Sequence, residues 1–190
     1  MAWLISTEPQ LVIGEIRSNC EKTFDLEVIE LGAGCGLAGL TAARILDRRE
    51  SLRCRVILTD LEEVISTSLA PNVDRTKQAL SKDTAIEIET IPYTWGTSIP
   101  FPAVDSKKSL ILANDVLYNP ENQAVFLETI LRLFGTRQNV STLLAYRPRT
   151  EGDHLFFQTA QRAGLVVERI ARVGAVVVFK ISPTLSNTDR

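Results

Sequence analysis

Three glycines at alternate positions follow an acidic residue in the stretch from Val28 to Leu37, VIELGAGCGL. An apolar run precedes these glycines and a helical pattern of apolar residues follows them, which is typical of a buried strand, a tight loop and a helix. Glycines at this spacing let the main chain turn sharply and approach a ligand closely. Glu30, before the first glycine, can accept hydrogen bonds from a cationic group or a hydroxyl. The loop therefore predicts a site for a cofactor that combines an amino-acid tail with a nucleoside.

S-adenosylmethionine is such a cofactor, and a nicotinamide dinucleotide is the alternative. Gly34, Gly36 and Gly39 also match the dinucleotide fingerprint G-x-G-x-x-G. That fingerprint places a pyrophosphate against the amides at the helix start, where Glu30 would repel it. S-adenosylmethionine carries no phosphate and has a cationic amine, so Glu30 favours S-adenosylmethionine and leaves the nicotinamide cofactor as the weaker alternative.

Two further segments carry candidate binding residues. Asp60 and Leu61 end a second apolar run, and we expect the Asp60 carboxylate to bind the ribose hydroxyls. The alternative is that Asp60 or Thr59 caps the helix expected from Glu62. Trp95 precedes Gly96 in a proline-bounded loop, where it either lies over the adenine or closes the edge of the core.

A candidate reaction site follows the next apolar run, at Asn114, Asp115 and Tyr118. An acid and an aromatic residue at the end of a central strand suit an amine acceptor. The alternative is a segment that only leads into the helix at Pro120, with Tyr118 in the core. Amino-methylating enzymes of nucleic acids typically have Asn/Asp-Pro-Pro-aromatic here, whereas this chain has YNPE, which disfavours a nucleobase acceptor.

Alternating strands and helices must position these residues. The apolar patterns predict an opening helix with apolar positions from Leu4 to Ile16, and strands at 27–31, 56–60, 85–90 (an edge strand), 109–113 and 142–146. Helices are expected at 37–49, 62–77 with a kink near Pro71, 120–134 and 152–163, and a closing hairpin at 165–171 and 175–181. This alternation predicts an α/β fold with a doubly wound, mostly parallel seven-stranded sheet that is covered by helices on both faces. Ligands of such sheets bind at the carboxyl ends of the strands, where all the candidate residues fall.

Composition sets broader limits. The 190 residues, 45% of them hydrophobic, are enough for one domain, expected over 1–181 with a flexible polar tail at 182–190. Three cysteines without a C-x-x-C spacing argue against a disulfide framework and against a metal site. The net charge of −2 argues against nucleic-acid or membrane partners, and the arginines between 44 and 55 indicate a solvated helix face. With no signal peptide or membrane-spanning segment, we expect a location in the cytoplasm or also in the nucleus. With no heptad pattern, we expect a monomer.

In its glycine loop and in the candidate residues that follow the other strands, the chain resembles the seven-strand class I methyltransferases. More narrowly, it resembles the non-SET protein-lysine methyltransferases that modify cytosolic chaperones and translation elongation factors. The resemblance extends from about Trp3 to Ile181, and residues 30–36, 59–61, 95–96, 114–118 and 146–149 carry it. The glycine motif is common to many methyltransferases, whereas Asp-x-x-Tyr and Trp-Gly narrow the resemblance to this family. It implies the strand order 3-2-1-4-5-7-6.

The resemblance also implies roles for the candidate residues. S-adenosylmethionine would be held by Glu30, Gly32, Ala33, Gly34, Gly36, Asp60, Leu61, Trp95 and Asn114, and the acceptor site would be lined by Asp115 and Tyr118. The partner would be a protein substrate, such as a chaperone or an elongation factor. Family members usually carry a further segment before the helix that begins here at Trp3, so we expect weak cofactor binding, an alternative start or a substrate that completes the site.

A lysine acceptor constrains the role of Asp115. The ordinary pKa of lysine, about 10.4, leaves only ~0.04% of the amine neutral at pH 7. Because Asp115 is a weak base, we expect it to orient the amine while Tyr118 shapes an apolar channel. The sequence leaves open a small-molecule or protein-histidine methyltransferase and a non-catalytic binding module.

Overall fold

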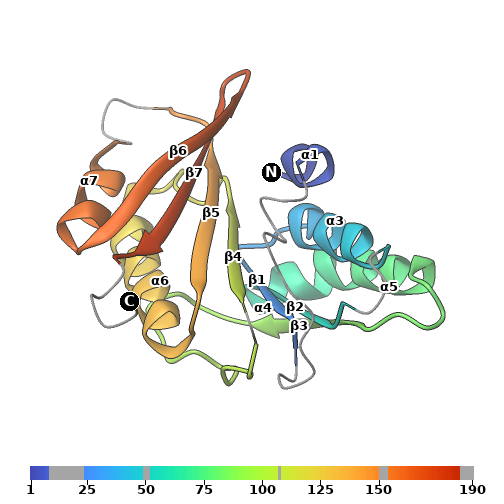
Figure 1. Cartoon of the computed structure of the whole chain (residues 1–190). Coiled ribbons are helices and arrows are strands. Elements are labelled where there is room, and N and C mark those ends of the chain that lie inside the picture. The colour runs from blue at the N-terminus through green and yellow to red at the C-terminus, as the bar shows by residue number, and fades with distance from the viewer. Residues whose placement is uncertain (9–23, 49–51, 107, 150–153, 185–190) are drawn as a thin grey trace.

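A single seven-stranded sheet runs through the computed structural model, which describes residues 1–8, 24–48, 52–106, 108–149 and 154–184. The strand order is β3-β2-β1-β4-β5-β7-β6, which confirms the order implied by the resemblance (Figure 1). The strands are β1 (Leu26–Leu31), β2 (Cys54–Asp60), β3 (Ile86–Pro92), β4 (Ser109–Asn114), β5 (Val140–Tyr146), β6 (Leu165–Val173) and β7 (Val176–Pro183).

Strand β1 lies at the centre of the parallel part of the sheet. It pairs with β2 on one side and β4 on the other, and β3 and β5 extend the parallel ladder outward. Strand β7 is antiparallel to both β5 and β6. All six residues of β1 are buried, as a strand covered on both faces requires. Because β1, β2 and β4 are parallel, Leu31, Asp60 and Asn114 end at the same edge of the sheet.

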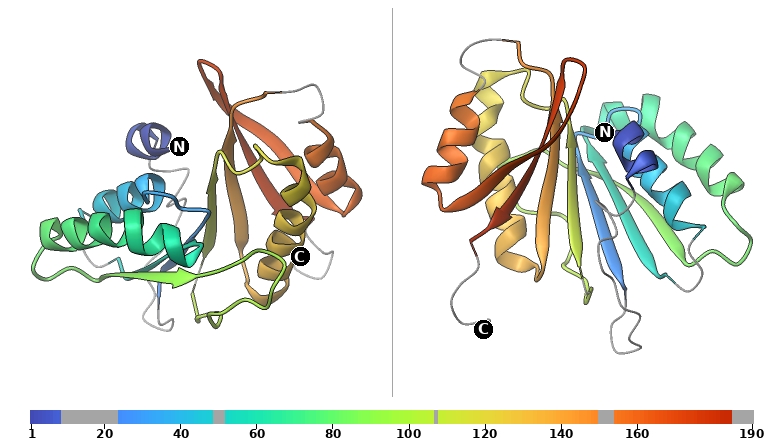
Figure 2. Two further views of the ribbon diagram at one scale, coloured as in Figure 1. Left: turned by 180° about the vertical axis from the view of Figure 1, so that it is seen from behind. Right: turned by 45° about the horizontal axis from the view of Figure 1, so that its top comes forward.

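Helices cover both faces of the sheet, as the alternation predicts. Helices α1, α3 and α5 lie on one face, and α6 and α7 lie on the other (Figure 2). Their bounds are α1 (Ala2–Thr7), α3 (Leu37–Leu46), α4 (Glu62–Val64), α5 (Ala70–Ala79), α6 (Gln123–Thr136) and α7 (His154–Arg162). Within the described ranges, none of the helices has the length and apolar character needed to cross a bilayer.

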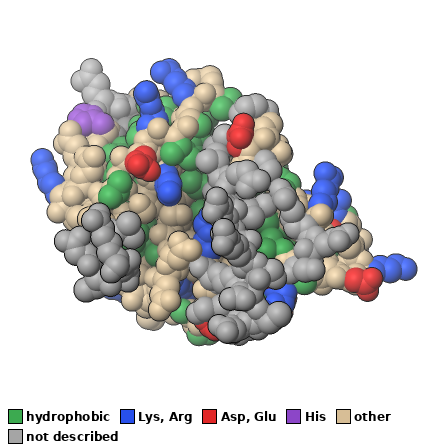
Figure 3. Space-filling model, in the orientation of Figure 1, with side chains coloured by type: hydrophobic (Ala, Val, Ile, Leu, Met, Phe, Trp, Pro, Cys, Tyr) green, Lys and Arg blue, Asp and Glu red, His purple; other side chains and the backbone are tan. Residues whose placement is uncertain are grey.

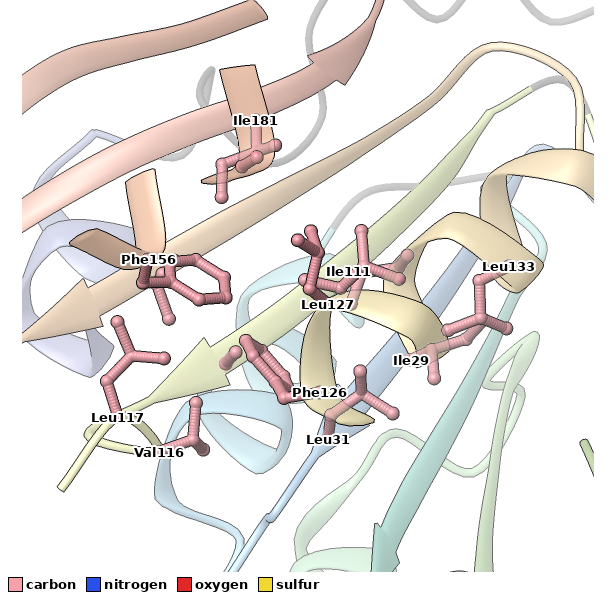
Figure 4. Close-up of a cluster of buried hydrophobic side chains, with 14 of the residues drawn as sticks. Ile29, Leu31, Ile111, Val116, Leu117, Phe126, Leu127, Leu133, Phe156 and Ile181 are labelled. Atoms are coloured by element: carbon pink, nitrogen blue, oxygen red, sulfur yellow. The ribbon is translucent and has the colours of Figure 1, made fainter. Parts of the chain in front are cut away.

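Each face of the sheet has its own hydrophobic cluster. Leu40 and Leu46 of α3 pack with Leu58 and Leu110 of the sheet on the first face. On the second face, Phe126 of α6 is fully buried and lies next to Leu31 of β1 (Figure 4). Burying one large apolar side chain contributes about 1.5–3 kcal/mol, so these contacts hold the helices against the sheet and fix the loops at its carboxyl edge.

Several element boundaries differ from the sequence expectation. The helix expected at 62–77 consists of α4, a π-helical turn (Ile65–Leu69) and α5, and Pro71 lies in the first turn of α5. Pro71 has no N–H to continue the regular helical ladder, which is the physical reason for the interruption. The helix expected from Pro120 begins with a 3-10 turn (Pro120–Asn122), in which the Asn119 side chain accepts a hydrogen bond from Glu121 N at 3.0 Å.

The two ends of the chain also differ from expectation. Strand β7 continues to Pro183, and Ser182 pairs with Val166 of β6, so the first residues of the expected tail belong to the sheet. Backbone pairing with β6 overrides the polar composition that indicated a loose segment. The opening helix ends at Thr7. The rest of that expected helix, up to Ile16, falls within residues 9–23, which lie outside the described residues, as does the tail at 185–190.

Arg55 is buried in β2, which corrects its assignment to a solvated helix face. It lies in register with Glu27 of β1 and donates two hydrogen bonds to Glu89, at 2.9 and 3.1 Å. Glu27 is fully buried and accepts hydrogen bonds from Arg137 Nε at 2.7 Å and from Ser109 Oγ at 3.2 Å. Arg55 therefore forms part of a charged network in the sheet. Its position in the strand determines which residues surround it, and the neighbouring arginines in the sequence do not.

Candidate functional site

The glycine loop between β1 and α3 has a left-handed backbone at Gly32, Gly34 and Gly36, with φ of 67°, 57° and 80°. Glycine adopts this conformation without strain. A Cβ at Gly36 would meet the Leu69 side chain at 2.6 Å, and one at Gly32 would meet Val116 at 3.0 Å, whereas a Cβ at Gly34 would meet no atom within 4 Å. The loop is therefore packed against the protein at Gly32 and Gly36 and open at Gly34, where a ligand can approach the main chain.

Glu30 connects the end of β1 to the first turn of α3. Its side chain is buried, and Oε2 accepts a hydrogen bond from Gly39 N at 2.8 Å. A Cβ at Gly39 would lie 2.3 Å from Leu58 and 2.7 Å from Glu30 Oε2, so only glycine permits this approach. Burial raises the pKa of Glu30 to about 8. The observed role of Glu30 is to hold the loop, and its expected contact with the cofactor amine stays a prediction.

Asp60 lies beside the open side of the glycine loop. Its Oδ2 accepts a hydrogen bond from Gly34 N at 2.7 Å, and its Oδ1 accepts one from Leu61 N at 2.8 Å. Helix α4 has no side-chain cap, and Thr59 Oγ1 donates to Glu30 O at 2.8 Å, so the capping alternative is wrong. Each carboxylate oxygen keeps a second lone pair that can accept from a hydroxyl. This position is compatible with ribose binding.

Trp95 contributes an aromatic surface under the same loop. Its ring packs on Phe126 with the centroids 4.9 Å apart, and a Cβ at Gly32 would lie 3.2 Å from the Trp95 ring. The following residue, Gly96, donates its N–H to Thr129 Oγ1 of α6 at 3.1 Å. Trp95 therefore closes the edge of the core, as one of the two interpretations predicts, and its contact with an adenine stays a prediction.

Asp115 begins the turn after β4 in an unusual backbone conformation. Its φ is 59°, and its N–H donates to Ala145 O of β5 at 2.7 Å. Aspartate tolerates the left-handed region better than most residues because its short polar side chain can bond locally. The preceding residue, Asn114, is the exposed last residue of β4. The structure thus brings Asp115 to the same edge as the glycine loop and Asp60.

Arg149 is a partner of Asp115 that the sequence analysis missed. Its Nη1 and Nη2 donate to the two carboxylate oxygens at 2.8 and 2.7 Å. These hydrogen bonds hold the pKa of Asp115 below its ordinary value. The two side chains remain 40% and 46% exposed, for Arg149 and Asp115 respectively. The available signal was an arginine shortly after β5, the strand adjacent to β4, but sequence alone does not specify that pairing.

Tyr118 lies at the rim of this edge and not in the core. Its side chain is 66% exposed, whereas the preceding residues Val116 and Leu117 are buried. Leu61, after β2, is likewise exposed. The core alternative for Tyr118 is therefore wrong, and the exposed ring is available to a substrate. No direct contact joins Tyr118 to Asp115 among the hydrogen bonds and ring contacts of the described residues.

Three comparisons with known proteins agree with this geometry. A sequence model of the family described as lysine methyltransferase matches residues 5–163. The protein N-lysine methyltransferase METTL21A of Xenopus tropicalis is 33% identical over 132 residues, which cover 69% of this chain and 54% of that protein. A UPF0665 family protein of Schizosaccharomyces pombe is 28% identical over 132 residues, which cover 70% of this chain and 36% of that protein.

The structure of LepI in complex with SAM superposes with a TM-score of 0.55 at 15% identity, over 93% of this chain and 47% of that one. This likeness shows the Rossmann-like class I methyltransferase fold. The chain spans between about a third and a half of the length of the two relatives named above. The match to the family model nevertheless extends over most of the chain and supports S-adenosylmethionine as the cofactor. The chain belongs to the lysine methyltransferase family.

Proposed function

We propose that this protein transfers the methyl group of S-adenosylmethionine to the side-chain amine of a lysine in a protein substrate. The observation that carries the proposal is that candidate cofactor-binding residues and candidate acceptor-site residues lie at the same edge of the sheet. Asp60 contacts Gly34 at the open part of the glycine loop, and Asp115 lies at the end of β4 on that edge. Membership in the lysine methyltransferase family and the similarity to METTL21A support a protein lysine as the acceptor.

The residues at this edge fit the cofactor. Asp60 offers acceptor oxygens beside the open main chain at Gly34, and Trp95 provides an apolar surface under the loop. The loop sequence from Glu30 to Gly36 contains no lysine or arginine that would bind a phosphate. When bound, S-adenosylmethionine supplies an electrophilic methyl group on a cationic sulfur, and the protein supplies alignment and exclusion of water.

The transfer itself requires a neutral acceptor amine. The lysine nitrogen uses its lone pair to form the new N–C bond as the C–S bond breaks, the sulfur keeps that electron pair, and the surplus proton on nitrogen leaves to water. Asp115, whose pKa is low, is a poor base but a good hydrogen-bond acceptor, so its role is to orient the amine. The exposed Tyr118 ring offers an apolar wall to the methylenes of the lysine side chain.

The proposed class of substrate rests on the sequence resemblance, which assigns the substrate to chaperones or translation elongation factors. The proposed location, cytoplasmic and also nuclear, and the proposed monomeric state are instead expectations from the composition and patterns of the sequence. On the face of the molecule in Figure 3, acidic and basic side chains of the described residues are scattered without a large patch of one sign. This distribution favours a protein partner over a nucleic acid.

Methyl transfer to proteins of a cytosolic lysate, with methyl-labelled S-adenosylmethionine, tests the proposal. We expect the wild type to label a discrete protein band and Asp115→Asn to label it about 100-fold more slowly, since misplacing a reacting group has an effect of this size. Asparagine also tolerates the left-handed backbone at this position. Binding of S-adenosylmethionine, measured by titration calorimetry, should change little in the variant.

Glu121→Ala is the matched control, because Glu121 is an exposed acid on the turn that follows Tyr118 and removing it changes the net charge equally. It should label the band at the wild-type rate. Equal rates for the wild type and Asp115→Asn would exclude the assignment of Asp115. A wild type that binds the cofactor but labels no protein would favour a small-molecule acceptor or a non-catalytic binding module.

A further inference from the structure

Strand β5 and the segment that follows it hold Asp115 by both its backbone and its side chain. The Asp115 N–H donates to Ala145 O at 2.7 Å, at a residue whose φ is 59°. Both oxygens of the carboxylate accept hydrogen bonds from the Arg149 guanidinium, at 2.8 and 2.7 Å. Such a two-pronged contact fixes the plane of the carboxylate as well as its position.

The ion pair between Arg149 and Asp115 affects the protonation of an acceptor amine, which must be neutral to react. A lone carboxylate next to a lysine favours the ammonium form, whereas a nearby cation disfavours it. A carboxylate whose charge is balanced by a guanidinium can still accept a hydrogen bond from an amine, because each of its oxygens has a second lone pair. Orientation and deprotonation of the acceptor are then compatible, which they would not be with Asp115 alone.

We propose that Arg149 is a positioning residue of the acceptor site, which fixes the Asp115 carboxylate and balances its charge so that the lysine amine is oriented without being retained as an ammonium ion. This inference rests on the proposed function and adds a residue outside the Asp-x-x-Tyr motif. The partial exposure of both side chains, 40% and 46%, leaves the pair accessible to a substrate from solvent.

The arginines near Asp115 shift its pKa in the same direction. Arg149, and more weakly Arg147 in the same segment, lower the pKa of Asp115, while burial opposes them. Glu30, on the neighbouring strand β1, accepts a hydrogen bond from Gly39 N. On the turn after β4, Tyr118 is exposed. The local balance at Asp115 therefore depends mainly on the arginine that contacts it.

The pH dependence of methyl transfer tests this inference. Initial rates of labelling of the lysate band are measured from about pH 6.5 to 9.5 at saturating S-adenosylmethionine, for the wild type, Arg149→Gln and Arg149→Lys. In Arg149→Gln we expect the rising limb of the pH–rate profile to move about one pH unit higher, since a charge within about 4–6 Å of a titrating group shifts its pKa by about 1–3 units. The rate at pH 7.5 then falls about tenfold and approaches that of the wild type at alkaline pH. Arg149→Lys keeps the charge and should shift the limb less.

Arg132→Gln is the matched control, because Arg132 forms a similarly exposed ion pair with Glu128 within α6, at 2.6 Å. It should leave the pH profile unchanged. A second measurement follows the Asp115 carboxyl directly by NMR of ¹³C-labelled aspartate, where Arg149→Gln should raise its pKa.

Four results would overturn the inference. A rate that falls by the same factor at every pH would assign Arg149 a purely structural role, and an unchanged profile would assign it none. An Asp115 carboxyl that titrates identically in both proteins would show that the pair does not form in solution. If the wild type labels no protein while it binds S-adenosylmethionine, the proposed function fails, and the inference fails with it.

Discussion

Glu30 shows how a single residue can serve the loop before any ligand binds. The carboxylate is buried, accepts a hydrogen bond from Gly39 N at 2.8 Å, and has its pKa raised to about 8. The dominant cause is loss of hydration, and the negative charge of Asp60 adds to it. At pH 7 the folded protein therefore favours a protonated Glu30, and a cationic group that enters beside it would favour ionisation.

This residue predicts a pH dependence of stability. Because its folded pKa lies above its ordinary value of 4.5, Glu30 contributes stability that is full below about pH 4.5 and is lost as the pH rises to about 8. Glu30→Gln keeps the shape and has no charge to bury. The free energy of unfolding of the variant, measured in urea, should therefore exceed that of the wild type increasingly from pH 5 to 8, by a few kcal/mol at most at about 1.4 kcal/mol per pKa unit. A difference that is constant over this range would contradict the assignment.

Residue types at the site could be predicted from the sequence, but their partners could not. Glu30, Asp60 and Asp115 each end an apolar run, so the expectation that they share an edge follows from parallel strands. Their partners depend on how distant segments of the chain come together. These partners are Gly39 for Glu30, Gly34 for Asp60 and Arg149 for Asp115. No local pattern encodes these pairings.

At the scale of elements, a charged network joins strands far from the cofactor edge. Glu27 of β1 lies in register with Arg55 of β2 and with Ser109 of β4, and accepts a hydrogen bond from Arg137 after α6 at 2.7 Å. The Arg137 side chain is 2% exposed and its guanidinium lies 5.4 Å from the centre of the Phe101 ring. The position of α6 against the sheet thus depends on a charge pair as well as on Phe126.

Removing one charge of this network should be costly. Glu27→Gln leaves Arg137 without a counterion in a buried position, and breaking such a pair destabilises a protein by about 3–5 kcal/mol. Urea unfolding followed by circular dichroism measures the change. Glu128→Gln, which breaks the exposed pair with Arg132 in α6, is the control and should cost less than about 1 kcal/mol. Similar losses for the two variants would show that the buried pair contributes no more than a surface pair.

Element types were more predictable than their ends and interruptions. Apolar runs and helical spacing gave every strand and the main helices, because burial on both faces of a parallel sheet leaves a strong pattern. Pro71 predicted an interruption of the helix, but neither the π-helical form of the turn before it nor the continuation of β7 to Pro183 followed from local composition. Both are decided by which backbone groups find partners in three dimensions.

At the scale of the whole molecule, the fold brings the candidate cofactor residues and the candidate acceptor residues to one edge while leaving an exposed aromatic residue, Tyr118, at the rim. The alternation of strands and helices predicted the layers, and the resemblance supplied the strand order. The acceptor itself is not encoded in these features, because the sheet and its glycine loop are compatible with several acceptors.

The position of the transferred methyl group tests the central claim most directly. The band that the wild type labels and Asp115→Asn labels far more slowly is digested, and the modified residue is identified by mass spectrometry. Our account predicts methylation of the side-chain nitrogen of a lysine. A methyl group on histidine or another residue, or label found only in the small-molecule fraction, would contradict it.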